Sequence, residues 1–138
     1  MGTNFYLHRN VCGHCGRGDP PKHIGKSSGG WAFSLHVYPE EGIRDLNDWI
    51  PLFEDVKDNA IKNEYGEKLT ASEMQAEITD RSWKTDVKIP YGYVDWEEFH
   101  RKNCSEPGPC GLTRAKIDGQ RVIGHGDGTW DLMVGEFS

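Results

Sequence analysis

Alternating apolar and polar positions predict several β-strands. The clearest run is WAFSLHVY at residues 31–38, where every second residue is large and apolar and Pro39 follows directly. This period-two alternation is typical of a strand with one buried face. The same criterion, together with the turn signals Tyr65-Gly66 and Asp118-Gly119, gives the remaining strands. They are expected at residues 5–8, 22–24, 60–64, 112–117, 121–123 and 132–134, with 112–117 and 121–123 joined as a hairpin.

Three short helices are expected between these strands. Residues 45–56 carry apolar side chains at helical spacing, and Pro51 belongs near a first turn, so the regular helix should begin close to residue 47. A capping box at residues 70–73, with the sequence TASE, opens a second helix that ends near residue 79. Asp95 caps a third helix that ends near residue 103.

The chain has the size of one domain. It has 138 residues, and its low hydrophobic content of 36% is offset by five Trp, five Tyr and five Phe, each of which buries a large area. We therefore expect a single α+β domain over residues 1–138, in which an antiparallel sheet packs against about three short helices. No apolar run approaches the length of a membrane span, and no basic segment followed by an apolar one opens the chain. These features predict a soluble, intracellular protein.

The thiols of Cys12 and Cys15, within VCGHCG, predict a metal site. Two thiolates separated by two residues can bind one ion from a tight turn, and the adjacent glycines permit the positive φ that such a knuckle needs. Redox dithiols share this spacing but usually begin a helix, and the sequence GRGDPP that follows cannot begin one. Structural zinc is therefore favoured over a redox pair or an inert turn. A fully ligated zinc ion would hold the fold and leave no open position for chemistry.

Two further ligands would complete a tetrahedral zinc site. His8 and His23 flank the knuckle, on the two strands of the hairpin that it is expected to cap, and we favour them because local ligands need no long loop closure. Cys104 and Cys110 would instead give an all-thiolate site that ties the end of the domain to its beginning, and a mixed set is also open. Without zinc, Cys104 and Cys110 are expected to be free thiols.

The segment HIGKSSGGW at residues 23–31 is a candidate phosphate-binding loop. Backbone amides beside glycines, the ammonium of Lys26 and the hydroxyls of Ser27 and Ser28 are groups that surround phosphate oxygens. It is not a Walker loop, because the earlier glycine is missing and a strand follows instead of a helix. Trp31 at its lip could stack on a base. The alternative is a hairpin turn with a solvated lysine.

A second polar, glycine-rich turn, GHGDGTWD, occupies residues 124–131. His125 could donate to the same anion, or act with Asp127 as an acid and base pair, and Trp130 could stack on the ligand. The alternative is a turn whose aspartates and glycines only satisfy backbone geometry. His36, in the alternating strand, is expected to be a partly buried structural histidine.

Charge is unevenly distributed along the chain. The net charge is −6, but residues 1–30 carry +3 and residues 31–100 carry −9. A small anion would be attracted to the basic N-terminal region, whereas duplex nucleic acid would meet an acidic remainder. The expected partner is therefore a small anionic ligand such as a nucleotide, or a host protein that binds the acidic surface.

The N-terminal MGTNFYLH, the Cys12/Cys15 knuckle, HIGKSSGGW, GHGDGTWD and the closing GEFS together resemble a family of small uncharacterised proteins encoded by tailed bacteriophages. The resemblance spans nearly the whole chain. It implies a setting in the host bacterial cytoplasm during infection. Small accessory phage proteins often counter host defences, and some unrelated families do so by sequestering nucleotide signals.

These observations lead to one favoured hypothesis and two alternatives. The favoured function is non-enzymatic binding of a small phosphate-bearing ligand, plausibly a nucleotide signal, by Lys26, Ser27 and Ser28, with Trp31 or Trp130 stacking and His125 donating. The first alternative is an interaction protein, or a nucleic-acid mimic, that acts through its acidic surface. The second is a phosphoester hydrolase, which is least favoured because no nucleophile with its base can be named from spacing.

Overall fold

The computed structural model describes residues 2–9, 20–28, 30–80, 91–117 and 121–135. A seven-stranded sheet, in the order β5-β4-β1-β2-β3-β9-β8, forms its centre, and a two-stranded sheet joins β6 to β7. Within the described ranges no helix is long and apolar enough to cross a membrane. The strands are β1 (Gly2–His8), β2 (Lys22–Ser28), β3 (Phe33–His36), β4 (Ala60–Asn63), β5 (Lys68–Leu69), β6 (Ser105–Pro107), β7 (Thr113–Ala115), β8 (Val122–His125) and β9 (Trp130–Met133).

The large sheet is antiparallel except at one junction. β3 pairs with β9 in parallel, and every other pairing in this sheet is antiparallel. The parallel junction brings residues 33–36 beside residues 130–133, so the C-terminal strands complete a sheet whose first strands lie near the N-terminus. Residues 2–8 and 22–28 are therefore central strands and form part of the main body of the fold.

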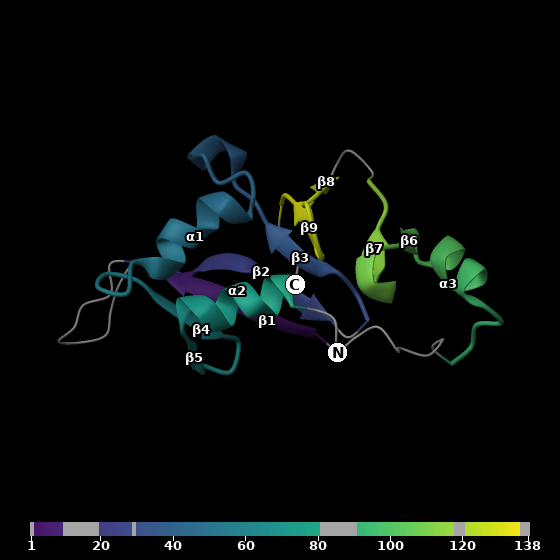
Figure 1. The fold of residues 1–138 in the computed structure, drawn as a ribbon, viewed down its shortest axis with the longest axis horizontal. Helices are drawn as coiled ribbons and strands as arrows, with labels where there is room; N and C mark the ends of the chain where they lie inside the picture. Colours follow the sequence, from purple (N-terminus) through teal and green to yellow (C-terminus); the bar gives the residue numbers. More distant parts are fainter. Residues whose placement is uncertain (1, 10–19, 29, 81–90, 118–120, 136–138) are drawn as a thin grey trace.

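Helices α1 (Leu46–Glu54) and α2 (Ala71–Thr79) lie over one face of the sheet, while α3 (Trp96–Lys102) lies beside β6 and β7 at the other end of the molecule (Figure 1). The capping box predicted at residues 70–73 is present. The α1 helix begins at Leu46, capped by Asp45, and contains Pro51 as its sixth residue. It therefore begins slightly earlier than expected. Short 3-10 turns occur at η1 (Pro39–Glu41) and η3 (Pro109–Gly111).

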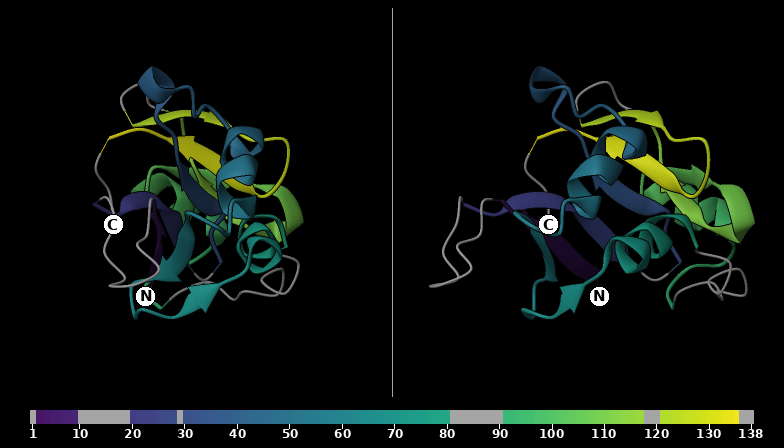
Figure 2. Two further views of the ribbon diagram at one scale, coloured as in Figure 1. Left: turned by 90° about the vertical axis from the view of Figure 1, so that its left-hand side faces the viewer. Right: turned by 60° about the vertical axis from the view of Figure 1, so that its left-hand side comes forward.

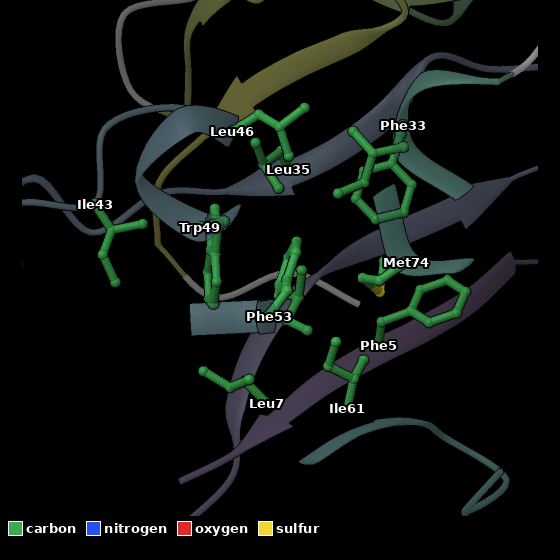
Figure 3. Packing of buried hydrophobic residues seen from close by; sticks show 12 residues of the cluster. Phe5, Leu7, Phe33, Leu35, Ile43, Leu46, Trp49, Phe53, Ile61 and Met74 are labelled. Carbon is green, nitrogen blue, oxygen red and sulfur yellow. The ribbon is translucent and has the colours of Figure 1, made fainter. Parts of the chain in front are cut away.

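The hydrophobic core fills the space between the sheet and the helices α1 and α2. Figure 3 shows side chains from β1 and β3 pointing toward those of α1 and α2. The largest fully buried side chains of the core include Trp49, Phe33 and Phe53. Fully burying such a side chain contributes about 1.5–3 kcal/mol relative to leaving it exposed. Every second residue of β1 and β3 faces this core. The intervening residues face away from the helices.

One predicted hairpin does not form between the strands that the structure describes. β7 pairs with β6 and β8 pairs with β9, so the strands near residues 113 and 122 do not pair with each other. The Asp118-Gly119 turn signal lies outside the described residues. Figure 2 shows α3, β6 and β7 grouped beyond the end of the large sheet. Each of the two strands pairs instead with its other neighbour in sequence, β7 with the preceding strand β6 and β8 with the following strand β9.

The predicted fold class is confirmed. A mostly antiparallel sheet packs against short helices, which is an α+β arrangement. The zinc knuckle that was expected to accompany it, at Cys12 and Cys15, lies outside the described residues.

Candidate ligand-binding face

The face of the sheet opposite α1 and α2, called here the helix-free face, carries a row of polar residues. Asn4 on β1 pairs with Lys26 on β2, Lys26 with Ser34 on β3, Ser34 with Asp131 on β9, and Asp131 with His125 on β8. Directly paired residues project from the same face of a sheet, and neighbouring strands are about 4.8 Å apart. The pairing thus brings Lys26 and His125, which are 99 positions apart in sequence, onto one surface.

The segment predicted as a phosphate-binding loop is strand as far as Ser28. Residues 22–28 pair with β1, and Gly25 and Lys26 also pair with β3, so this backbone belongs to the sheet ladder. The side chains of Lys26 and Ser28 nevertheless converge. An added Cβ at Gly2 would lie 2.2 Å from Cε of Lys26 and 2.8 Å from Oγ of Ser28, so both side chains lean over Gly2. Ser27 projects from the opposite face.

Two further lysines lie on the helix-free face. Lys62 on β4 pairs with Tyr6, and Lys68 on β5 pairs with Lys62. Across the described ranges, Lys26, Lys62 and Lys68 form no ion pair. The helices α1 and α2 on the other side carry no lysine or arginine, and their charged residues are all acidic. These are Asp48, Glu54, Glu73 and Glu77. The charged residues of the two helices are thus acidic, whereas the helix-free face carries three lysines together with Asp131 and, beside Asn4, Glu64, whose Oε1 accepts the backbone N–H of Asn4 at 2.8 Å.

A cluster of hydrogen-bonding groups lies next to the lysines. Nε2 of His23 is 2.8 Å from Oδ1 of Asn4, and Nδ1 of His23 is 3.0 Å from Nδ1 of His36. The hydroxyl of Tyr38 donates to the carbonyl of His23 at 2.8 Å, and its ring stacks on His36 at 4.2 Å. The cluster joins three strands and the turn after β3. It lines one side of an open cavity of about 670 Å³.

Burial keeps this cluster uncharged. Burial, reinforced by Lys26, lowers the pKa of His23 to about 4, and burial together with the neighbouring His23 and Lys22 lowers the pKa of His36 to about 4. Burial, then Glu41 and Glu40, raises the pKa of Tyr38 to about 12. At neutral pH the imidazoles and the phenol are therefore neutral. With an exposed fraction of 7%, His36 is more deeply buried than the partly buried histidine that the sequence predicted.

His125 belongs to a second polar cluster at the far end of the row. Its Nδ1 is 2.7 Å from Oδ1 of Asp131, and its Nε2 is 3.1 Å from Oε1 of Glu106. Arg114 on β7 donates from Nε to the same oxygen of Asp131 at 2.9 Å. The partners of His125 are thus Asp131 and Glu106, and not Asp127 as the sequence suggested. With both ring nitrogens in contact with carboxylates, His125 connects the large sheet to β6.

The two candidate stacking tryptophans lie away from Lys26. Trp31 bridges to Thr113 and its ring contacts Phe99 of α3. Trp130 pairs with Phe33, whose side chain is in the core, and packs against that core on the helix side of the sheet. The structure therefore brings together Lys26 and Ser28, and it places His125 on the same face three strands away. It does not bring Ser27, Trp31 or Trp130 to them.

The expected metal ligands are only partly described. Cys12 and Cys15, and the side chain of Cys110, lie outside the described residues. Cys104 is exposed. His8 is partly buried at the end of β1, and His23 contacts Asn4 and His36. In the described part of the chain no three His, Cys, Asp or Glu side chains form a group that could hold a metal. Zinc binding thus stays a prediction.

Sequence reasoning missed Lys62, Lys68 and Arg114 as members of these clusters. A period-two pattern predicts that the side chains of Lys62 and its apolar neighbour Ile61 point to opposite faces of the sheet. It does not predict which strand lies beside them. The pairing of β4 with β1 supplies that information. Comparison of the chain with family models, curated proteins and solved structures gives no match.

Proposed function

We propose that the protein binds a small phosphate-bearing ligand, without transforming it, on the helix-free face between Lys26 and Lys62. One observation carries this proposal. Three lysines without ion pairs among the described residues share this face, whereas the charged residues of the two helices on the other face are all acidic. A compact anion is attracted to the first face and repelled by the second.

The geometry between Lys26 and Lys62 suits a ligand of small size. Their strands are separated by β1 alone, so the two backbones are about 10 Å apart across the sheet. Lys26 leans toward Gly2, away from Tyr6 and Lys62, so its long side chain must turn toward β4 for the two lysines to contact one anion. Asn4 and Tyr6 lie on β1 between them, and Ser28 lies beside Lys26. These groups offer hydrogen bonds to phosphate or sugar oxygens.

The resemblance to phage accessory proteins favours a nucleotide signal of a host defence system as the ligand. The tryptophans Trp31 and Trp130 lie elsewhere, and the ring of Tyr6, which is on the helix-free face, packs against His23 at 5.4 Å. We therefore assign recognition to the phosphate groups, and expect weak discrimination between bases. A hydrolytic role is not favoured, since both ring nitrogens of His125 are in contact with carboxylates.

Isothermal titration with inorganic phosphate, adenosine nucleotides and cyclic dinucleotides tests the proposal. Hydrogen bonds to charged groups contribute about 1.5–3 kcal/mol, so Lys26→Gln and Lys62→Gln should each weaken binding by about tenfold or more. The matched control is Lys57→Gln, which removes an exposed lysine from the turn after α1 and should leave affinity unchanged. No heat and no thermal shift across the whole panel would remove the proposal.

A second function, binding of a host protein to the acidic helix layer, is favoured by one observation. Val56, two residues beyond the acidic Glu54 that ends α1, is an apolar side chain with 76% exposure. Binding of this kind should weaken with salt and with Glu54→Lys and Glu73→Lys, and should survive Lys26→Gln. The same variants therefore separate the two functions.

A further inference from the structure

We propose that Nδ1 of His23 and Nδ1 of His36 bind one divalent transition-metal ion, zinc being the best match. The ion would lie between strands β2 and β3, at the edge of the open cavity. The sequence favoured His8 as the partner of His23, so the assignment of His36 is new. The inference does not depend on the phosphate-binding function.

The distance between the two nitrogens fits shared coordination. They face each other at 3.0 Å. Two imidazole nitrogens bound to one tetrahedral zinc at 2.0–2.1 Å are about 3.3 Å apart, so the ion requires an opening of about 0.3 Å and a tilt of both rings that turns their lone pairs away from the line between the nitrogens. Such a shift is small beside the freedom of a side chain that borders a cavity.

The hydrogen bonds around His23 fix its protonation. An amide oxygen only accepts, so the 2.8 Å contact with Oδ1 of Asn4 requires a hydrogen on Nε2 of His23. In the neutral ring this leaves the lone pair on Nδ1, directed at His36. A metal-binding histidine usually donates its other N–H to an oxygen in this way, which orients the ring. Asn4 is therefore a positioning residue for the metal site.

His36 must change tautomer when the ion binds. Without metal, Nδ1 of His36 donates its hydrogen to the lone pair of His23. The hydroxyl of Tyr38, 3.2 Å from the same Nδ1, already donates to the carbonyl of His23 and so does not compete as a donor. With metal bound, the hydrogen moves from Nδ1 to Nε2 of His36, and both Nδ1 lone pairs face the ion. No net proton is released by the pair.

The environment suits a soft or borderline cation. Both rings are neutral, which is the form of imidazole that binds metal. Imidazole nitrogen favours zinc, copper and nickel over magnesium or calcium. Two ring nitrogens fill only half of a tetrahedral site. The cavity leaves room for water at the remaining positions. The absorption spectrum of the protein with cobalt in place of zinc would show whether thiolates also coordinate.

The test uses the full chain, stripped with EDTA and titrated with zinc against a chromophoric chelator. His36→Gln should weaken zinc binding by about tenfold or more, and the matched control His8→Gln should leave it unchanged. Circular dichroism checks that both variants fold. Unchanged affinity in His36→Gln, or loss of binding in His8→Gln alone, would overturn the assignment.

Long-range nitrogen-15 NMR of the wild-type protein gives an independent readout that needs no variant. Addition of zinc should convert His36 from the Nδ1–H to the Nε2–H tautomer and perturb Nδ1 of both His23 and His36. If zinc binds while both rings keep their metal-free signals, the ion is held elsewhere and the proposal is wrong.

Discussion

The indole nitrogen Nε1 of Trp130 donates a hydrogen bond to Oδ1 of Asp45 at a distance of 2.9 Å. The same oxygen accepts the backbone N–H of Leu46 at the start of α1. One carboxylate thus joins the last strand of the sheet to the first turn of a helix 85 positions earlier in the chain. The ring is further enclosed by Gly126 and Gly128, where an added Cβ would lie less than 3 Å from it.

We expect Trp130→Phe to lower the free energy of unfolding without changing ligand affinity. Loss of the indole N–H removes one hydrogen bond to a charged group, and the smaller ring leaves unfilled space, so the cost should be about 2–3 kcal/mol. Urea denaturation measures the stability, and titration with phosphate ligands measures the affinity. A stable variant with weakened binding would instead place Trp130 in the ligand site.

The pattern of the sequence predicted the α+β class, the capping box and most strands, because these depend on residues close together in the chain. It predicted the pairing of β1 with β2, as the two strands of the hairpin at the knuckle, but not most of the other neighbours in the sheet. The parallel pairing of β3 with β9 joins segments nearly a hundred residues apart, and no local signal encodes it. Lys26 and His125 were candidates because each lies in a glycine-rich polar segment. Lys62 was not a candidate, because only the strand pairing places it near Lys26. The position of Trp130 on the helix side also follows only from its pairing with Phe33.

Arg114→Met should strongly destabilise the protein. Asp131 is 2% exposed, and Arg114 is its guanidinium partner at 2.9 Å. Removing the arginine leaves a buried carboxylate whose remaining donors in the described part of the chain are His125 and the backbone amide of Ala115. Breaking one partner of a buried ion pair costs about 3–5 kcal/mol. Thermal and urea unfolding should both show the loss.

The control for this prediction is Lys102→Met. Lys102 pairs with Glu98 one turn earlier in α3 at 3.1 Å, with its side chain 56% exposed. An exposed pair of this kind contributes about 0.3–0.5 kcal/mol, so the variant should unfold almost like the wild type. Equal effects of the two substitutions would contradict the importance assigned to the buried pair.

Gly25→Ala should destabilise the sheet through a steric clash. A Cβ at this position would lie 2.2 Å from the backbone oxygen of Ser34 and 2.5 Å from the ring of Phe33. The strands β2 and β3 would have to move apart, at a cost of about 1–3 kcal/mol. Gly124→Ala is the matched control, because its Cβ would meet only a methyl group of Leu132 at 3.8 Å. Urea midpoints should fall for the first variant and stay near wild type for the second.

Stability should fall as the pH is lowered from about 7 to about 4 in metal-free protein. His23 and His36 have folded-state pKa values of about 4, whereas the ordinary value in an unfolded chain is about 6.5. Below pH 6.5 the unfolded chain therefore binds protons that the folded protein does not, and the equilibrium shifts toward unfolding. The loss begins near pH 6.5 and ends once the folded-state rings also titrate, near pH 4.

Urea midpoints at pH 7 and pH 5 in EDTA, for the wild type and for a His23→Gln/His36→Gln double variant, measure this effect. The drop between the two pH values should be clearly smaller in the double variant, since glutamine cannot take up a proton in either state. A wild-type protein equally stable at both pH values, or an undiminished drop in the double variant, would show that these two rings are not held neutral by the fold. In that case the hydrogen bond between their Nδ1 atoms would also have to be reassigned, because a charged His23 has no lone pair to accept it.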